Sequence, residues 1–215
     1  MQPSKQVCVV GAGEWGGNHI RTLFELGALG GIVDSRENIR DNFQRIYPSI
    51  SVFQNVSDAL LAEEFDGYVV ATPAETHYGI ALEIINAGRH VLVEKPVTLK
   101  IDEVYRLKEY AEAQHVNLMA GHLLLFHPAI QKIRKMLDSG IIGDLQYIYS
   151  NRLNLGAVRT KENVFWSLAP HDISIFNDLI NSDIDKVESF GSDIIQQGIQ
   201  DSTITSIKYT NGVSA

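Results

Sequence analysis

The sequence predicts an α/β protein in which a doubly wound parallel sheet is followed by an incomplete α+β part. Three observations lead to this prediction. Short β-branched runs alternate with amphipathic stretches as far as about residue 120, which is typical of a parallel sheet with helices on both faces. A glycine-rich turn follows the first run. After Gly121 the strand-like runs become longer, which favours a mixed or antiparallel sheet.

The first part, residues 1–121, is expected to contain six strands and five helices. The strands are expected at 6–10, 30–34, 50–53, 67–71, 90–94 and 117–120, and the helices at 15–27, 36–46, 57–63, 76–87 and 100–115. Ile20, Leu23 and Phe24 have helical spacing. Gly27 and Gly88 are placed to end helices, because glycine readily takes the left-handed conformation found there.

The second part, residues 122–215, is expected to contain a helix at 129–137 and another at 169–181. Strand-like runs lie at 144–155, 186–196 and 201–209. Asn211-Gly212 is typical of a hairpin turn, and the sequence ends three residues later at Ala215. A strand left without its partner exposes an open sheet edge, so we expect that later strands of this sheet are missing.

The glycine turn Gly11-Ala12-Gly13-Glu14-Trp15-Gly16 stands between the first expected strand and the first expected helix. That context is the one in which Gly-x-Gly-x-x-Gly binds a dinucleotide. Gly11 permits the tight turn, Gly13 lets the main chain approach a pyrophosphate, and Gly16 lets the helix pack closely. The helix start offers free N–H groups to the phosphates. The alternative is a plain glycine turn followed by an acidic loop.

An acidic residue, Asp34, ends the second expected strand 21 residues after Gly13. A carboxylate at this position accepts hydrogen bonds from the adenosine ribose, which completes the Rossmann pattern. It also repels a 2′-phosphate, so NAD is favoured over NADP. Arg36 keeps NADP open as the less favoured alternative, because a nearby arginine accommodates that phosphate.

Composition excludes several other classes of protein. The net charge of −8 argues against a nucleic-acid partner. The single cysteine, Cys8, has no partner for an internal disulfide and is expected to be a buried apolar residue. No apolar run approaches the length of a membrane span, and no signal peptide is recognisable, so the cytoplasm is the expected compartment. The spacing of cysteine, histidine and acidic residues does not resemble a metal site.

Two further segments are expected at the carboxyl ends of the strands, where open α/β sheets bind ligands. One contains Thr72, Pro73 and His77, and the other is Glu94-Lys95-Pro96. Lys95 could donate or accept a proton there, with its pKa lowered by a cationic nicotinamide. The alternative is a surface lysine before a turn proline.

A second group of polar residues lies in the second part. Pro170 suits a first helical turn, so His171 and Asp172 are expected near a helix start, which helps to keep His171 a neutral base. Both could equally be capping residues. Arg152 and Asn154 are two apart on an expected strand and share a face, where they bind an anionic or sugar-like ligand or line a solvated surface. His122 is a further candidate near the crevice.

Together these residues resemble the Gfo/Idh/MocA family of NAD(P)-dependent oxidoreductases. The resemblance is carried by the glycine turn with Gly17-Asn18-His19, by Ala71-Thr72-Pro73 with His77, and by Gly88-Arg89-His90-Val91-Leu92-Val93-Glu94-Lys95-Pro96. It implies that 1–121 is a Rossmann domain with Lys95 beside the nicotinamide and the substrate. The implied cofactor contacts are Gly11, Gly13, Glu14, Trp15, Gly16, Asp34, Ser35, Arg36, Thr72, Pro73, His77, Glu94 and Lys95.

The resemblance also implies that 122–215 is a substrate and oligomerisation domain, whose catalytic histidine matches His171. The family usually has an aspartate four residues earlier, where this chain has Ser167, so the partner of His171 stays open. Segments 151–156 and 166–172 are similar to a subgroup that oxidises the 3-hydroxyl of UDP-N-acetylglucosamine or its uronic acid. The implied substrate contacts are Lys95, His122, Arg152, Asn154, His171 and Asp172.

An NAD-dependent sugar dehydrogenase is therefore the expected function. Two alternatives stay open, a non-catalytic NAD-binding fragment and a dehydrogenase of a free sugar or inositol. Family members are longer and often associate through the sheet of the second domain. A homo-oligomer is therefore expected for a full-length parent, whereas the assembly of this chain is left open.

Overall fold

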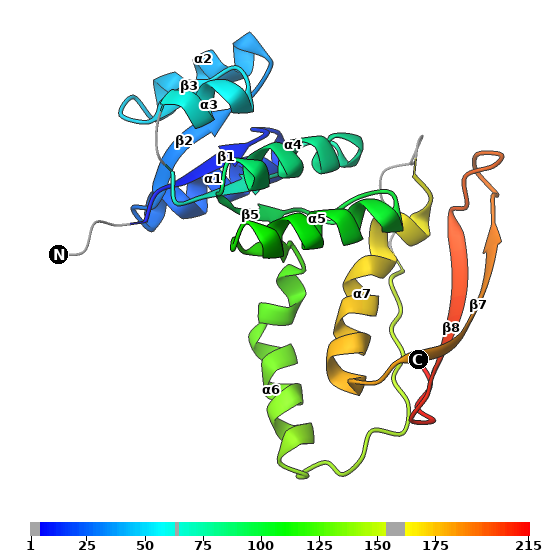
Figure 1. Cartoon of the computed structure of the whole chain (residues 1–215). Coiled ribbons are helices and arrows are strands. Elements are labelled where there is room, and N and C mark those ends of the chain that lie inside the picture. Colours follow the sequence, from blue (N-terminus) through cyan, green and yellow to red (C-terminus); the bar gives the residue numbers. More distant parts are fainter. Residues whose placement is uncertain (1–4, 63–64, 154–161) are drawn as a thin grey trace. The chain divides into compact units, whose positions relative to one another are not determined.

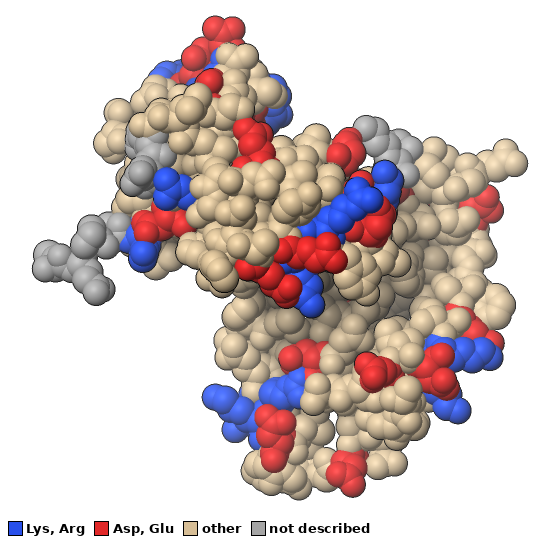
Figure 2. Space-filling model, in the orientation of Figure 1, with Lys and Arg blue, Asp and Glu red and all other residues tan. Residues whose placement is uncertain are grey.

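The computed structural model describes residues 5–62, 65–153 and 162–215. The chain divides into two compact units, Met1–Gly121 and His122–Ala215 (Figure 1). On the face seen in Figure 2, basic and acidic side chains are interspersed and not separated by sign.

The first unit is built on a six-stranded parallel sheet whose spatial order is β3-β2-β1-β4-β5-β6. Each adjacent pair of strands is parallel. The chain starts in the middle of the sheet, winds out to β3, and crosses back to continue from β4, so the predicted doubly wound sheet is confirmed. The strands are β1 (Val7–Val10), β2 (Leu29–Val33), β3 (Ser51–Phe53), β4 (Gly67–Val70), β5 (His90–Val93) and β6 (Leu118–Ala120).

Helices cover both faces of this sheet. Cys8 and Val10 point into one buried cluster, which they share with residues of α3, α4 and α5. Val9 points the other way, into a cluster with Ile20 of α1, as the alternation of side chains along a strand requires. The helices are α1 (Glu14–Glu25), α2 (Glu37–Ile46), α3 (Val56–Ala62), α4 (Ala74–Asn86) and α5 (Ile101–Ala113).

The second unit has a small antiparallel sheet and two longer helices. Its core joins Phe176 and Ile180 to Ile207 and Tyr209. The Tyr209 hydroxyl donates a hydrogen bond of 2.7 Å to Asn177 Oδ1, which ties helix to sheet. The elements are the 3₁₀ helix η1 (Leu123–Phe126), α6 (Pro128–Asp138), α7 (Val164–Ile180), β7 (Ile184–Ser192) and β8 (Ser202–Tyr209).

The predicted hairpin turn after β8 is confirmed. Gly212 has a φ of +90°, the conformation that favours glycine. Beyond it the chain turns back along β8, and Ile207 and Ala215 exchange two main-chain hydrogen bonds of 2.7 and 2.8 Å. On its other side this last segment meets Tyr147 through an isolated parallel bridge at Ser214.

Two strand predictions in the second unit need correction. The run 144–155 is not a strand over its described residues, 144–153, where the only bridge is the one at Tyr147. A strand needs a ladder of successive bridges, and over 144–153 the structure forms a single one, between Tyr147 and Ser214. β7 ends at Ser192, before the predicted 196, because the carboxylate of Asp193 accepts the N–H of Gly198 at 2.7 Å and draws the chain into a turn.

Candidate functional site

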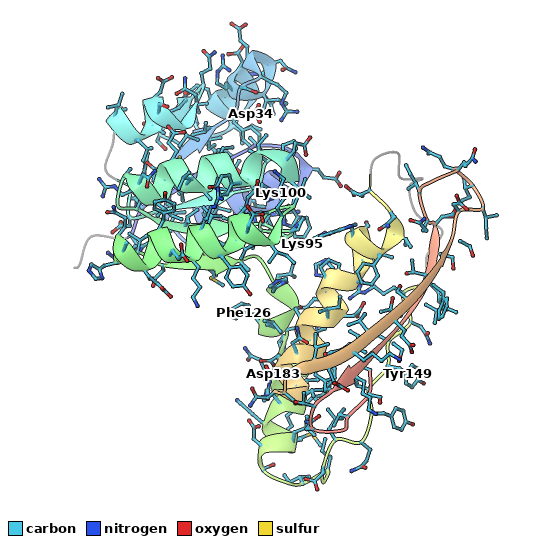
Figure 3. The ribbon with its side chains drawn as sticks, turned by 45° about the vertical axis from the view of Figure 1, so that its right-hand side comes forward. Asp34, Lys95, Lys100, Phe126, Tyr149 and Asp183 are labelled. Carbon is cyan, nitrogen blue, oxygen red and sulfur yellow. The ribbon has the colours of Figure 1, made fainter. Side chains whose placement is uncertain are left out.

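A pocket of about 790 Å³ lies at the carboxyl ends of β1, β2, β3 and β4. This edge includes the point where the winding of the sheet reverses, between β1 and β4, which is where open α/β sheets bind ligands. Nine of the residues predicted to bind a cofactor line the pocket: Gly11, Gly13, Glu14, Trp15, Asp34, Ser35, Arg36, Thr72 and Pro73. Figure 3 labels Asp34 in this unit.

The glycine turn has the geometry that its sequence predicts. Gly11 has a φ of +92°, and a Cβ there would lie 2.7 Å from the carbonyl oxygen of Ala71. A Cβ on Gly16 would lie only 1.8 Å from the carbonyl oxygen of Gly11, whereas one on Gly13 would meet no atom within 4 Å. The space beside Gly13 therefore allows a pyrophosphate to approach the main chain at the start of α1, and the residues fit a dinucleotide.

Asp34 is a buried carboxylate, with 5% of its surface exposed. Its Oδ2 accepts the N–H of Ala12 at 2.9 Å, and its Oδ1 accepts the N–H of Arg36 at 2.9 Å. The Arg36 guanidinium binds both oxygens, at 2.9 and 2.7 Å. Burial alone would raise the pKa of Asp34, but these hydrogen bonds outweigh it and lower the pKa below its usual value. Asp34 is therefore ionised at neutral pH, as a ribose acceptor must be.

Glu94 and Lys95 follow β5, next to this pocket in the sheet but outside its lining. Glu94 is buried, and its Oε1 lies 2.8 Å from His19 Nε2. The Lys95 N–H donates to Glu94 Oε2 at 3.2 Å. Burial raises the pKa of Glu94, but hydrogen bonds from His19 and Trp15 lower it further than burial raises it. The carboxylate therefore anchors the main chain at Lys95 as an anion.

His77 was expected to contact the cofactor, but its ring does not line the pocket. The side chain is buried, and its two ring nitrogens lie 2.8 Å from the carbonyl oxygens of Pro96 and Thr72. The ring therefore binds the main chain of two loops.

Sequence reasoning overlooked two sets of residues in this unit. The pocket is also lined by Gln54, Asn55 and Ser57 after β3, and by Ile80 and Glu83 of α4. The polar pair Gln54-Asn55 directly after an expected strand was a usable signal, because the carboxyl ends of parallel strands share one edge. His19 was the other omission. Trp15 and His19 are four apart on α1, so they share a helix face, and both bind Glu94.

The predicted position of His171 and Asp172 near a helix start is wrong. α7 begins at Val164, where the side chain of Asn163 caps it by accepting the N–H of Trp166 at 3.1 Å. Pro170 lies inside the helix, where a proline removes one main-chain hydrogen bond. His171 and Asp172 therefore lie more than a turn from the helix start, beyond the reach of its partial charge.

Arg152 and Asp172, both predicted to bind substrate, are brought together by the fold. Arg152 Nε donates to Asp172 Oδ2 at 2.6 Å, and both line a pocket of about 590 Å³ between α7, β8 and segment 149–153. Arg152 keeps a third of its side chain exposed, at 34%. A partly exposed guanidinium with a carboxylate partner can bind an anionic or hydroxyl-rich ligand.

None of the other described substrate candidates lines the pocket of Arg152 and Asp172. His122 lines a different, shallow pocket with Arg134 and Asp178, and Asn154 lies outside the described residues. His171 does not line the pocket of Arg152; its carbonyl oxygen accepts a hydrogen bond from the hydroxyl of Ser174 at 2.7 Å.

In residues 5–62, 65–153 and 162–215, no three histidines, cysteines or acids are grouped to hold a metal ion. Within the same ranges, no helix has both the length and the apolar character to cross a membrane.

Two family models match the chain. The model described as "Oxidoreductase family, NAD-binding Rossmann fold" matches residues 5–122. The model described as "GFO/IDH/MocA C-terminal domain" matches residues 130–215.

Comparison with individual proteins also finds dehydrogenases. The chain is 32% identical to the UDP-N-acetylglucosamine 3-dehydrogenase of Acidithiobacillus ferrooxidans, over 78% of this chain and 51% of that protein. It is 30% identical to inositol 2-dehydrogenase 1 of Saccharopolyspora erythraea, over 85% of this chain and 56% of that protein. The chain thus spans about half the length of these curated relatives.

Two solved structures share its fold. The UDP-N-acetylglucosamine 3-dehydrogenase GnnA of A. ferrooxidans superimposes with a TM-score of 0.89 at 27% identity, covering 98% of this chain and 65% of that one. The WlbA dehydrogenase of Bordetella pertussis, in complex with NADH and UDP-GlcNAcA, gives a TM-score of 0.84 at 21% identity, covering 98% and 69%. With its glycine turn, its Asp34 and both family models in place, the chain belongs to the Gfo/Idh/MocA family of oxidoreductases and carries the NAD-binding Rossmann fold of that family.

Proposed function

We propose that this chain is part of an NAD-dependent dehydrogenase that oxidises a secondary alcohol of a sugar, at C3 of a nucleotide-linked amino sugar. The observation that carries the proposal is the pocket at the point where the winding of the sheet reverses. The open turn at Gly13 can bind the pyrophosphate of a dinucleotide there, and the ionised Asp34 can accept hydrogen bonds from its ribose. The similarity to a UDP-N-acetylglucosamine 3-dehydrogenase supports the substrate class.

NAD supplies the hydride acceptor when it is bound. The chain's own residues bind and orient. The amides at the start of α1 and the turn at Gly13 hold the pyrophosphate, and Asp34 accepts hydrogen bonds from the ribose hydroxyls. Lys95, whose main chain is held by Glu94, is proposed to lie beside the nicotinamide. Its ammonium can donate a hydrogen bond or transfer a proton there.

In the second unit, we propose that His171 is the general base that removes the proton of the substrate hydroxyl. We propose that Arg152 and Asp172 bind polar groups of the substrate. The 2.6 Å contact between them orients the guanidinium. Arg152 is the residue suited to a phosphate or a uronic carboxylate, because its planar fork binds such groups through two parallel hydrogen bonds.

The proposal is tested with purified protein in two steps. Calorimetric titration with NAD and NADP measures cofactor binding and preference. Formation of NADH is then followed with UDP-N-acetylglucosamine, its uronic acid, free N-acetylglucosamine and inositol as substrates. We expect NAD to bind more tightly than NADP and the nucleotide sugars to be oxidised fastest. If folded protein binds NAD but none of the four substrates causes NADH to form, the result would instead support a non-catalytic NAD-binding module.

Inositol is the second candidate substrate, because the similarity to an inositol 2-dehydrogenase extends over a larger share of the chain, 85%, than the similarity to the nucleotide-sugar enzyme, 78%. Faster oxidation of inositol than of either nucleotide sugar would show that inositol is the preferred substrate.

Association into a homo-oligomer and residence in the cytoplasm are proposed for the full-length protein. Light scattering of the purified protein and fractionation of the source cells would test them.

A further inference from the structure

His77 of α4 joins two loops at the carboxyl ends of neighbouring strands. Its surface is 1% exposed. Nδ1 lies 2.8 Å from the carbonyl oxygen of Pro96, after β5, and Nε2 lies 2.8 Å from the carbonyl oxygen of Thr72, after β4. β4 and β5 are adjacent in the sheet. The ring is therefore a bridge between the segment that forms one wall of the dinucleotide pocket and the segment that carries Lys95.

Both contacts are with carbonyl oxygens, which accept hydrogen bonds and cannot donate them, so the ring is the donor of any hydrogen bond formed here. The ring is also buried between the two loops, so a side chain without its N–H would leave a carbonyl group in this place without a donor, which is costly.

We infer that His77 is a positioning residue for Lys95, and that its buried ring clamps the Pro96 segment to the Thr72 segment. The N–H of Lys95 is held on one side by Glu94 Oε2 at 3.2 Å. On the other side, the carbonyl of the following residue is held by His77. The main chain at Lys95 is thus fixed from both directions. Because Thr72 lines the pocket, the ring also sets where the lysine stands relative to the cofactor.

The function of the clamp rests on the proposed role of Lys95, but its existence does not. Hydrogen exchange of the main chain in the clamped segments is measured without any substrate.

Two single-arm variants test the clamp itself. The amide nitrogen of asparagine reaches the position of Nδ1, and that of glutamine reaches the position of Nε2, so His77→Asn keeps the Pro96 contact and His77→Gln keeps the Thr72 contact. The control is His115→Asn, at an exposed residue with a φ of 55°, a conformation that asparagine tolerates. Hydrogen exchange of segment 94–98, NAD affinity and turnover are measured for all three.

We expect both single-arm variants to exchange at least about ten-fold faster in segment 94–98, and the control to match the wild type. NAD affinity should stay within about three-fold while kcat falls by roughly ten- to a hundred-fold, since small misplacement of a catalytic group costs this much. Unchanged exchange in both variants would overturn the clamp. If the wild type turns over no sugar, the proposed function fails, and the exchange results still decide on the clamp. They also decide if one variant does not fold.

Discussion

Replacing Gly16 with alanine should destabilise the first unit, because a Cβ at this position would lie 1.8 Å from the carbonyl oxygen of Gly11 and 2.9 Å from its carbonyl carbon. Both atoms belong to the main chain of the glycine turn, so neither can rotate away as the end of a side chain could. α1 would have to move outward as a whole. Overpacking commonly costs about 1–3 kcal/mol, and we expect about 3 kcal/mol or more here because the obstacle is main chain.

The neighbouring glycine is the matched control. A Cβ on Gly17 would meet no atom within 4 Å, and Gly17 lies in the same helix. Alanine is favoured over glycine inside a helix by about 0.5–1 kcal/mol, so Gly17→Ala should stabilise the unit. Urea unfolding followed by tryptophan fluorescence and by circular dichroism compares the two. Equal stability of Gly16→Ala and Gly17→Ala would show that α1 does not pack against the turn as described.

Three further predictions concern single side chains. Asp34→Ala should weaken NAD binding about ten-fold or more, equivalent to about 1.4 kcal/mol per factor of ten; unchanged affinity by calorimetry would remove the ribose role of Asp34. Glu94 has a lowered pKa in the folded state, so it contributes stability above its unfolded pKa of about 4.5 and loses it as the pH falls through the folded value. Glu94→Gln should therefore flatten the acid side of the stability profile measured by urea unfolding, and an unaltered acid limb would contradict the anionic anchor. Tyr209→Phe removes the 2.7 Å hydrogen bond to Asn177 and should cost about 0.5–1.5 kcal/mol, whereas Tyr149→Phe, at an exposed tyrosine, should change the unfolding midpoint little.

The parallel sheet could be predicted from the sequence because each of its signals is local. A strand such as 7–10 is a compact apolar run, and the glycines that follow it are adjacent in the chain. The glycine turn and Asp34 likewise lie within one strand–helix–strand unit, so their meeting in the pocket follows from the motif alone.

The errors arose where the deciding contact was distant or was masked by a stronger local signal. Pro170 suggested a helix start, but the cap at Asn163 decided it. Nothing in the local pattern of 144–153 shows that its partner is the last segment of the chain, met at Ser214. The pair His19–Glu94 spans 75 residues and the ring of His77 reaches 19 residues ahead to Pro96, which no window of local pattern reveals.

Counting the donors around Asp34 shows what an arriving ribose must do. A carboxylate has about four sites at which it can accept, and here all are taken: two by the amides of Ala12 and Arg36 and two by the Arg36 guanidinium. The amides are fixed in the main chain, whereas more than half of the Arg36 side chain is in solvent, at 54%. We therefore expect the guanidinium to be the donor that gives way when a sugar hydroxyl binds Asp34. Entry of the nucleotide would then exchange one set of hydrogen bonds on the carboxylate for another.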